Sequence, residues 1–295
     1  MNRIYAICMA IVVAFASCEK PGDNSDYDFG DDFTTGSPSE DGSSSEGGPF
    51  ADGYGKLPET IRLVSYNVHR CTGPNTNVAN YDGLGEAIGL IDADVIGLQE
   101  LDSKTNRHPY KQVEELASRA GMSSQYCKTI DSNGGEYGIG VLYKKSMRVR
   151  DTYSGNLPGD EPRKFFLLEF DDYAFICTHF CHKSADNRNK SIDIINEYLV
   201  KNWSSYKKPI FLVGDLNCES GSEEMKKMFN TWTMISARKA TFFNTTTPKC
   251  IDFVLQWNGN NPQTEVLRSG IPQFPQVDFA KLSDHYPILV DLKKF

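Results

Sequence analysis

Short apolar runs alternate with amphipathic stretches from about residue 58 to the end of the chain. Continuous apolar runs of this length are typical of buried strands, and apolar residues spaced three or four apart are typical of helices. The predicted strands are 61–68, 94–98, 138–143, 165–170, 173–178, 209–213, 251–255 and 287–292, and the predicted helices carry apolar faces at 84–91, 113–117 and 192–203. The sequence shows no internal repeat and no second linker. The pattern therefore predicts one α/β domain over 58–295.

The chain begins with a pattern that is typical of exported proteins. A basic start at Arg3 is followed by 14 apolar or small residues, 4–17, and then by Cys18. This run is shorter than the ~20 residues of a spanning helix, so it indicates a signal peptide over residues 1–18. The Ala-Ser-Cys ending resembles a bacterial lipobox, which makes Cys18 the predicted lipidation site. The alternative is an ordinary cleaved signal with an incidental cysteine.

Residues 19–57 are rich in Gly, Ser, Asp and Glu and contain little that could pack. This composition predicts an acidic tether between a lipid anchor and the folded domain. We therefore expect an exported, membrane-anchored lipoprotein that faces the periplasm or the cell surface.

The net charge of −8 comes almost entirely from this N-terminal part. Residues 1–57 hold 3 basic and 10 acidic residues, a balance of −7, which leaves 28 basic and 29 acidic residues, a balance of −1, in the rest of the chain. Binding to duplex nucleic acid depends on neutralising many phosphates over a basic face. The near-neutral domain therefore argues against duplex nucleic acid as a partner.

The cysteines leave two interpretations open. Six of the 8 remain when Cys8 is removed with the signal and Cys18 is acylated, and an exported domain can pair them in disulfides that the sequence does not identify. A zinc site is a second option, because two cysteines and two histidines lie close together at Cys177, His179, Cys181 and His182. The competing interpretation of that segment is a strand that runs into a loop.

Polar residues stand where the predicted strands end, at positions that packing alone does not explain. They are Asn67, Gln99 and Glu100, Thr178 and His179, Asp215 and Asn217, Asp252, and Asp284 and His285. Loops at strand ends are where α/β folds build their sites. The sequence therefore predicts one functional site at this edge.

The order of these segments resembles the endonuclease/exonuclease/phosphatase superfamily of metal-dependent phosphoesterases. The matching stretches are 65–67, 98–100, 178–179, 214–217, 251–253 and 283–287, and agreement with the bacterial metal-dependent hydrolase branch extends to 100–107, 135–138, 161–163, 240–242 and Pro248. The resemblance implies a four-layer sandwich of two mixed β-sheets flanked by helices. Two departures are Phe180, where leucine is common, and His69-Arg70, where DNA-repair members carry an acidic residue.

The resemblance also implies a role for each strand-end residue. Mg²⁺ (or Mn²⁺) suits a site of carboxylates and amide oxygens, because a hard cation neutralises charge on a phosphoester. The implied metal ligands are Asn67, Glu100 and Asp284, and the implied catalytic residues are His179, Asp215, Asn217, Asp252 and His285. Asp252 is expected to orient His285, which shares the proton of the attacking water, and His179 is expected to face the phosphate. Arg107 and Arg163 are candidate substrate contacts, with a surface salt bridge as the alternative for each.

The leading hypothesis is an exported phosphoesterase that uses a divalent metal to hydrolyse a small phosphoester or a lipid headgroup. The alternatives are a secreted nuclease that acts on DNA, a catalytically inactive binding lipoprotein and the zinc protein described above. Retention of every charged residue of the pattern argues against an inactive copy, because buried carboxylates that lie close together are costly.

Overall fold

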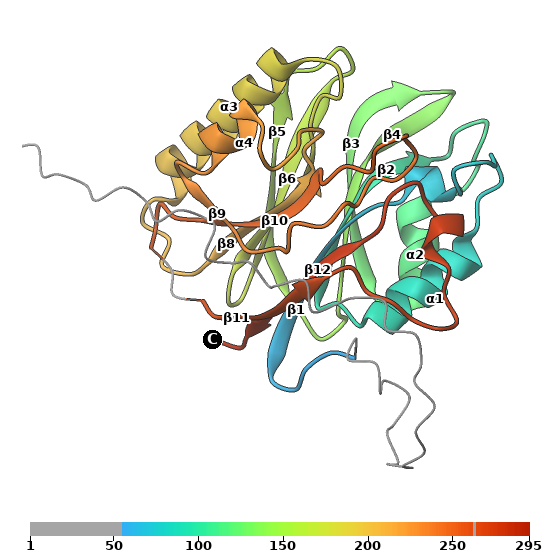
Figure 1. Ribbon diagram of the computed structural model, residues 1–295, viewed down its shortest axis with the longest axis horizontal. Helices are drawn as coiled ribbons and strands as arrows, with labels where there is room; N and C mark the ends of the chain where they lie inside the picture. Colours follow the sequence, from blue (N-terminus) through green and yellow to red (C-terminus); the bar gives the residue numbers. More distant parts are fainter. Residues whose placement is uncertain (1–54, 262–263) are drawn as a thin grey trace, which may run out of the picture.

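Two six-stranded sheets pack face to face in the computed structural model, which describes residues 55–261 and 264–295 (Figure 1). The first sheet has the order β11 (Val266–Gly270), β12 (Ile288–Lys293), β1 (Thr60–Asn67), β2 (Val95–Ser103), β4 (Gly135–Tyr143) and β3 (Ser123–Ser132). The second has the order β5 (Val149–Leu157), β6 (Arg163–Phe170), β7 (Ala174–His179), β8 (Ile210–Asp215), β10 (Asp252–Trp257) and β9 (Trp232–Met234).

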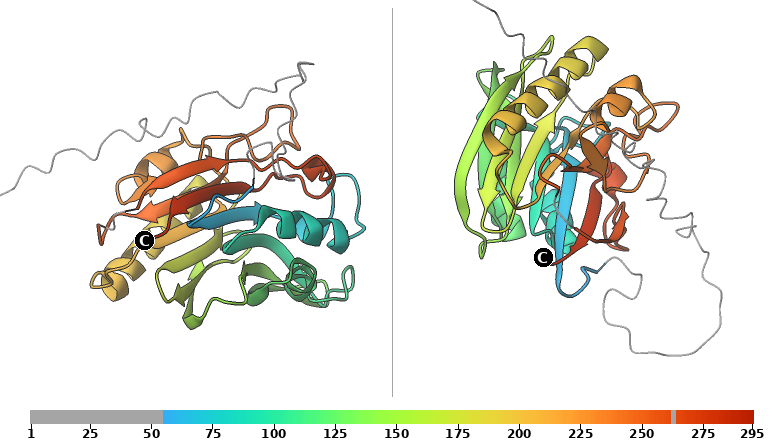
Figure 2. Two further views of the ribbon diagram at one scale, coloured as in Figure 1. Left: turned by 90° about the horizontal axis from the view of Figure 1, so that it is seen from below. Right: turned by 90° about the vertical axis from the view of Figure 1, so that its left-hand side faces the viewer.

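Each sheet is mixed, with one parallel pair of strands at its centre. Strands β1 and β2 are parallel in the first sheet, β7 and β8 are parallel in the second, and the other pairs are antiparallel. Figure 2 shows β12 against β1, so the two ends of the described chain share one sheet. The carboxyl ends of a parallel pair lie at the same edge, and this edge carries the polar residues described below.

Helices cover the outer face of each sheet. Helices α1 (Tyr81–Ile91) and α2 (Gln112–Ala120) lie outside the first sheet, and α3 (Ala185–Trp203) and α4 (Glu223–Met228) lie outside the second (Figure 1). Local sequence sets their ends. Asn80 and Ser184 accept hydrogen bonds from backbone N–H groups in the first turns of α1 and α3, and Gly121 ends α2 at φ 69°.

A core of buried apolar residues fills the space between the sheets, and the sheets approach closely at one glycine. A Cβ on Gly97 of β2 would lie 2.4 Å from Cγ2 of Val213 and 3.1 Å from Sγ of Cys177. The inner residues of β1, β7 and β8 are buried because these strands have a core on both faces. This double burial explains their continuous apolar sequences.

The predicted fold class is confirmed, and the eight predicted strands and three predicted helices are all present. The prediction missed strands β3, β5, β9 and β11 and the short helix α4. Strands β3 and β5 are edge strands with many polar residues at intermediate or exposed positions, so they lack the apolar pattern that marks a buried strand. Strand β2 also continues five residues past the predicted end at 98, to Ser103.

The predicted signal peptide, Cys18 and most of the predicted tether lie outside the described residues. Within the part that the structure describes, no helix combines the length and the apolar character needed to cross a membrane.

Candidate active site

The polar residues at the strand ends converge where the two sheets meet. Asn67 ends β1, and its Nδ2 donates hydrogen bonds to Oε1 of Glu100 at 3.2 Å and to Oδ2 of Asp215 at 3.1 Å. Asp215 ends β8 in the other sheet. A single amide group therefore connects the two sheets, and all three side chains face one another.

A β-bulge aims Glu100 at this junction. Leu98 of β2 pairs with Gly140 of β4, and Leu101 pairs with Gly138. Two residues of β2, Gln99 and Glu100, therefore lie opposite a single residue of β4. Glu100 takes a left-handed backbone conformation at φ 61°. Bulges commonly redirect a side chain next to a site, and this one turns Glu100 toward the β1 edge.

Asp215 lies at the centre of the cluster. Its Oδ1 accepts a hydrogen bond from the backbone N–H of Asn217 at 2.9 Å, and its Oδ2 lies 3.6 Å from Nε2 of both His179 and His285. Burial and the neighbouring Asp252 carboxylate raise the pKa of Asp215 to about 7. Asn217, at φ 52°, donates through Nδ2 to the backbone oxygen of Phe180 at 3.1 Å. The contacts of Asn217 thus fix the end of β8.

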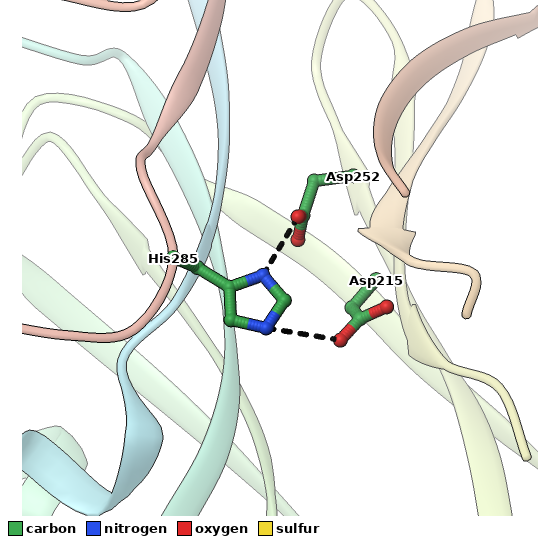
Figure 3. Close-up of side chains that lie close together, drawn as sticks. All are labelled: Asp215, Asp252 and His285. Atoms are coloured by element: carbon green, nitrogen blue, oxygen red, sulfur yellow. Dashed lines mark hydrogen bonds and ion pairs between the residues drawn. The ribbon is translucent and has the colours of Figure 1, made fainter. Parts of the chain in front are cut away.

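Asp252 and His285 form a buried pair, shown in Figure 3 with Asp215 on the far side of the imidazole. Nδ1 of His285 lies 2.8 Å from Oδ2 of Asp252. Asp252 begins β10 directly opposite Asp215, and it is fully buried. Burial opposes a charge on His285, but the Asp252 carboxylate outweighs burial and raises the pKa of His285 to about 10. The pair therefore carries an imidazolium at neutral pH.

His179 has the opposite electrostatic environment. It is 4% exposed, and burial together with the positive charge of Arg163 lowers the pKa of His179 well below its usual value. Its Nδ1 is buried and has no hydrogen-bond partner among the described residues. The site thus holds one charged and one neutral imidazole on the same carboxylate oxygen.

Asp284 lies beside a strained turn. Its Oδ2 lies 3.9 Å from Nε2 of His69. The same nitrogen of His69 accepts a hydrogen bond from Arg70 at 2.6 Å, and Nη1 of Arg70 lies 3.5 Å from Oε2 of Glu100. His69, Arg70 and Cys71 have φ angles of 45°, 57° and 60°. Left-handed conformations cost ~1–2 kcal/mol for residues other than glycine, and such strain gathers at functional sites. The turn places His69 and Arg70 between two predicted metal ligands.

Three residues that support the site are not among the predicted site residues. Oγ of Ser283 donates to the backbone oxygen of Asn67 at 2.7 Å and accepts from the N–H of His285 at 3.2 Å. Thr241 accepts from the N–H of Asp252 at 3.3 Å, and the ring of Phe242 packs on His285 with centroids 4.9 Å apart. All three lie in segments 240–242 and 283–287, which match the superfamily pattern. That match was the one feature of the sequence that could have indicated them.

Both predicted substrate arginines line a cavity beside Glu100 and His179, with a volume of about 350 Å³. Each also forms an ion pair. Arg107 binds Asp102 through two hydrogen bonds of 2.7 and 2.8 Å, and Arg163 lies 2.7 Å from Oε2 of Glu161. Both arginines therefore form a salt bridge and also line the cavity, so the two interpretations of each arginine hold together. A larger cavity of about 520 Å³ beside β11 and β12 contains none of the predicted site residues.

The oxygen atoms of the site suit a hard divalent cation. Glu100 offers a carboxylate, and Oδ1 of Asp284 is buried with no partner in the described part of the chain. Asn67 turns its Nδ2 toward Glu100, and its Oδ1 accepts a hydrogen bond from the backbone N–H of His69 at 3.0 Å. In residues 55–261 and 264–295, the His, Cys, Asp and Glu side chains that come together in a possible metal-binding group are Asp215, Asp252 and His285. Nδ1 of His285 and Oδ2 of Asp252 already bind each other, so the carboxylates of Glu100 and Asp284 are the better oxygen donors.

The zinc alternative finds no support in the geometry. Cys177 lies in the core between the sheets, where it contacts Gln99 and the backbone oxygen of Leu98. His179 faces Asp215, and Cys181 accepts a weak hydrogen bond from Asn187. All six cysteines of the described segments are free thiols, so none of the possible disulfides is present there.

The sequence pattern of the Endonuclease/Exonuclease/phosphatase family matches residues 64–285, so the chain belongs to this family. The match spans every predicted catalytic, metal-binding and substrate-binding residue, and Cys18 lies outside it. Members of the family are phosphoesterases and nucleases that generally depend on a divalent metal, which places the chain among the hydrolases. A comparison with curated proteins found no match.

Solved structures share the fold at low sequence identity. An endonuclease/exonuclease/phosphatase from Bacteroides vulgatus has a TM-score of 0.63 and 21% identity, over 79% of this chain and 98% of that chain. A mannosyl-6-phosphatase from Bacteroides thetaiotaomicron has a TM-score of 0.64 and 18% identity, over 79% and 99%. The catalytic domain of human nocturnin, with a bound sulfate anion, has a TM-score of 0.59 and 17% identity, over 79% and 93%.

Proposed function

We propose that this protein hydrolyses a small phosphoester or a lipid headgroup by divalent-metal-assisted attack of water. The observation that carries the proposal is the convergence on Oδ2 of Asp215. Nδ2 of Asn67 donates a hydrogen bond to this oxygen, and Nε2 of both His179 and His285 lies 3.6 Å from it. The same Nδ2 also donates to Glu100, so Asn67 connects Glu100 to Asp215. Phosphoester hydrolysis needs an acceptor for the proton of water and donors for the phosphate oxygens, and this cluster supplies both.

Glu100 and Asp284 would hold Mg²⁺ or Mn²⁺ through carboxylate oxygens, and Asn67 would join them with its amide group turned over, so that Oδ1 replaces Nδ2 beside Glu100. When bound, the cation neutralises charge on the non-bridging phosphate oxygens and favours ionisation of water. The side chain of Asn67 serves both parts of the site, because it contacts Glu100 and Asp215 together.

The remaining steps belong to the side chains of this chain. Oδ2 of Asp215 accepts the proton of the attacking water, and the charged imidazole of His285, whose Nε2 lies 3.6 Å from that oxygen, supplies the proton that the leaving oxygen needs. Asp252 holds His285 by Nδ1 and leaves Nε2 directed at Asp215. His179, which lies on the cavity side and is neutral, donates a hydrogen bond to a phosphate oxygen.

We also propose that the protein is exported and anchored in a membrane by a lipid on Cys18. The 14-residue apolar run and the Ala-Ser-Cys ending support this proposal, together with the acidic tether composition of residues 19–57. More than one acyl chain is needed for stable anchoring.

The small-substrate proposal is supported by the near-neutral domain and by the size of the cavity. A volume of about 350 Å³ lies at the lower end of small-molecule sites. One fold relative is described as a mannosyl-6-phosphatase, which is consistent with a small phosphomonoester. Duplex DNA is not the proposed partner.

The test is a comparison of the purified full chain on small phosphomonoesters, small phosphodiesters, sphingomyelin vesicles and duplex DNA at ~0.15 M salt. The proposal expects turnover of a small ester or the lipid with Mg²⁺ or Mn²⁺, and loss of that turnover with a chelator. Cleavage of duplex DNA with no turnover of the other substrates would replace the proposal with a nuclease. Activity that survives the chelator would refute the role of the metal.

A further inference from the structure

The cavity of about 350 Å³ beside the catalytic cluster is lined by residues with polar side chains. Its lining includes Glu100 and His179 of that cluster, Arg163 at the start of β6 and the partner of Arg163, Glu161. Nine residues line the cavity, and every one of them has a polar side chain. Small-molecule sites are usually lined mainly by apolar side chains, so this composition is informative about the ligand.

Arg163 gives the wall an unusual hydrogen-bonding capacity. This residue is 4% exposed, and Nη1 lies 2.7 Å from Oε2 of Glu161. Its Nε is buried and has no hydrogen-bond partner among residues 55–261 and 264–295, and the same is true of Nδ1 of His179. Buried polar atoms normally have partners. Both side chains line the cavity, so a small adjustment of either one would bring its unpartnered nitrogen to a hydroxyl group of a ligand.

The charges of the cavity orient such a ligand. Arg70, which the left-handed turn holds 3.5 Å from Oε2 of Glu100, brings a positive charge to the catalytic side. A phosphate group therefore belongs at that side. The lining also contains the Arg163–Glu161 pair, in which donors and acceptors lie next to each other. A hydroxyl group needs that combination, because it both donates and accepts.

The lining also argues against an alcohol that carries an acyl chain, because such a chain would require apolar side chains. Tyr137 is the one lining residue with a phenyl ring, and it is 8% exposed.

We propose that the cavity binds the alcohol part of the substrate and that this alcohol is a sugar or another polyol. The inference rests on the proposed phosphoesterase function and narrows it to a class of hydrophilic phosphoesters. Arg163 and Glu161 select the alcohol, and Arg70 binds the phosphate.

The test uses two monoesters of primary alcohols, a hexose 6-phosphate and butyl phosphate, with the full chain and Mg²⁺. Their leaving groups are chemically similar and differ mainly in hydroxyl groups. We expect kcat/KM for the hexose phosphate to exceed that for butyl phosphate at least ~10-fold. Glu161→Gln and Arg163→Gln should reduce this ratio by ~10–100-fold, as for the loss of hydrogen bonds to charged groups. Glu161→Gln replaces a half-exposed side chain, so it tests the proposal if Arg163→Gln fails to fold.

The control is Arg150→Gln. Arg150 pairs with Asp171 on the surface and does not line the cavity, so the ratio should not change. The proposal is overturned if butyl phosphate, sphingomyelin vesicles or DNA is the better substrate. It is also overturned if the ratio is the same in Glu161→Gln as in the wild type.

A binding measurement separates this inference from the proposed function. Calorimetry with the hexose 6-phosphate and the full chain needs no turnover. Saturable binding that weakens in Glu161→Gln would support the polyol site even if no ester is hydrolysed, and only the proposed function would then fall. If the hexose phosphate is neither bound nor hydrolysed, the inference is overturned as well.

Discussion

Replacing Asp252 by Asn tests the buried pair at the centre of the site. The substitution keeps the size of the side chain and removes the charge that faces Nδ1 of His285 at 2.8 Å. Both residues are less than 5% exposed, so solvent screens their interaction little. A hydrogen bond to a charged group contributes about 1.5–3 kcal/mol. At about 1.4 kcal/mol per factor of ten in rate, we expect kcat to fall roughly 10- to 150-fold.

The assay is a double-mutant cycle with His285→Ala, measured as kcat on the best small phosphoester. His285→Ala alone should cost ~10²–10⁴-fold, the range for general acid–base catalysis. Asp252→Asn in the His285→Ala background should then have almost no further effect, because the partner is already absent. Proton NMR of the imidazole gives a second signal. The wild-type ring should stay protonated to about pH 10, and the ring in Asp252→Asn should lose its proton at lower pH.

The matched control is Asp193→Asn, which removes an exposed carboxylate that pairs with Lys227 on the surface. This variant should keep the wild-type rate. Two results would refute the reasoning: a rate for Asp252→Asn within twofold of the wild type, or the same loss from Asp252→Asn with and without His285. Circular dichroism of each variant separates a change in chemistry from a failure to fold.

Three further predictions concern the metal, the stability and the lipid. Glu100→Gln should lower turnover by at least ~10²-fold and weaken the binding of Mn²⁺ measured by calorimetry; unchanged binding would exclude Glu100 as a ligand. Burial would raise the pKa of Glu224, but hydrogen bonds to its carboxylate, including one from Arg188, lower the pKa from its ordinary 4.5, so Glu224→Gln should cost ~1.5–3 kcal/mol in free energy of unfolding at pH 7. That difference should shrink as the pH falls below 4.5 in urea titrations, because the wild type then loses the same charge. Labelled fatty acid should enter the wild-type chain and be absent from Cys18→Ser; label that persists would place the lipid elsewhere.

The sequence predicted where the site lies because burial and polarity change abruptly at the strand ends. Strands β1, β7 and β8 are buried on both faces, and each ends at a polar residue, Asn67, His179 or Asp215. Parallel strands bring such ends to one edge, so a one-dimensional pattern was sufficient. The edge strand β5 escaped prediction because its residues gain little burial and depend on pairing with β6.

The sequence did not predict the turn at His69–Cys71. The turn contains no glycine, and His69 is the one residue of the three whose type is enriched in the left-handed region. Its composition therefore does not indicate three left-handed residues in a row. The conformation depends on contacts with Asp284 and Glu100, which are distant in sequence. The bulge that turns Glu100 has the same origin, because it exists only relative to the register of β4. Backbone strain of this kind is set by tertiary structure.

The site depends on both sheets at once, which explains why its geometry is not visible in any one segment. Asn67 comes from the first sheet and Asp215 from the second, and their hydrogen bond of 3.1 Å exists only at the observed separation of the sheets. That separation is set in the core, where Gly97 leaves no room for a side chain against Val213. Because protein interiors are close-packed and transmit strain, the spacing of the catalytic groups is coupled to the packing of core residues that never touch a substrate.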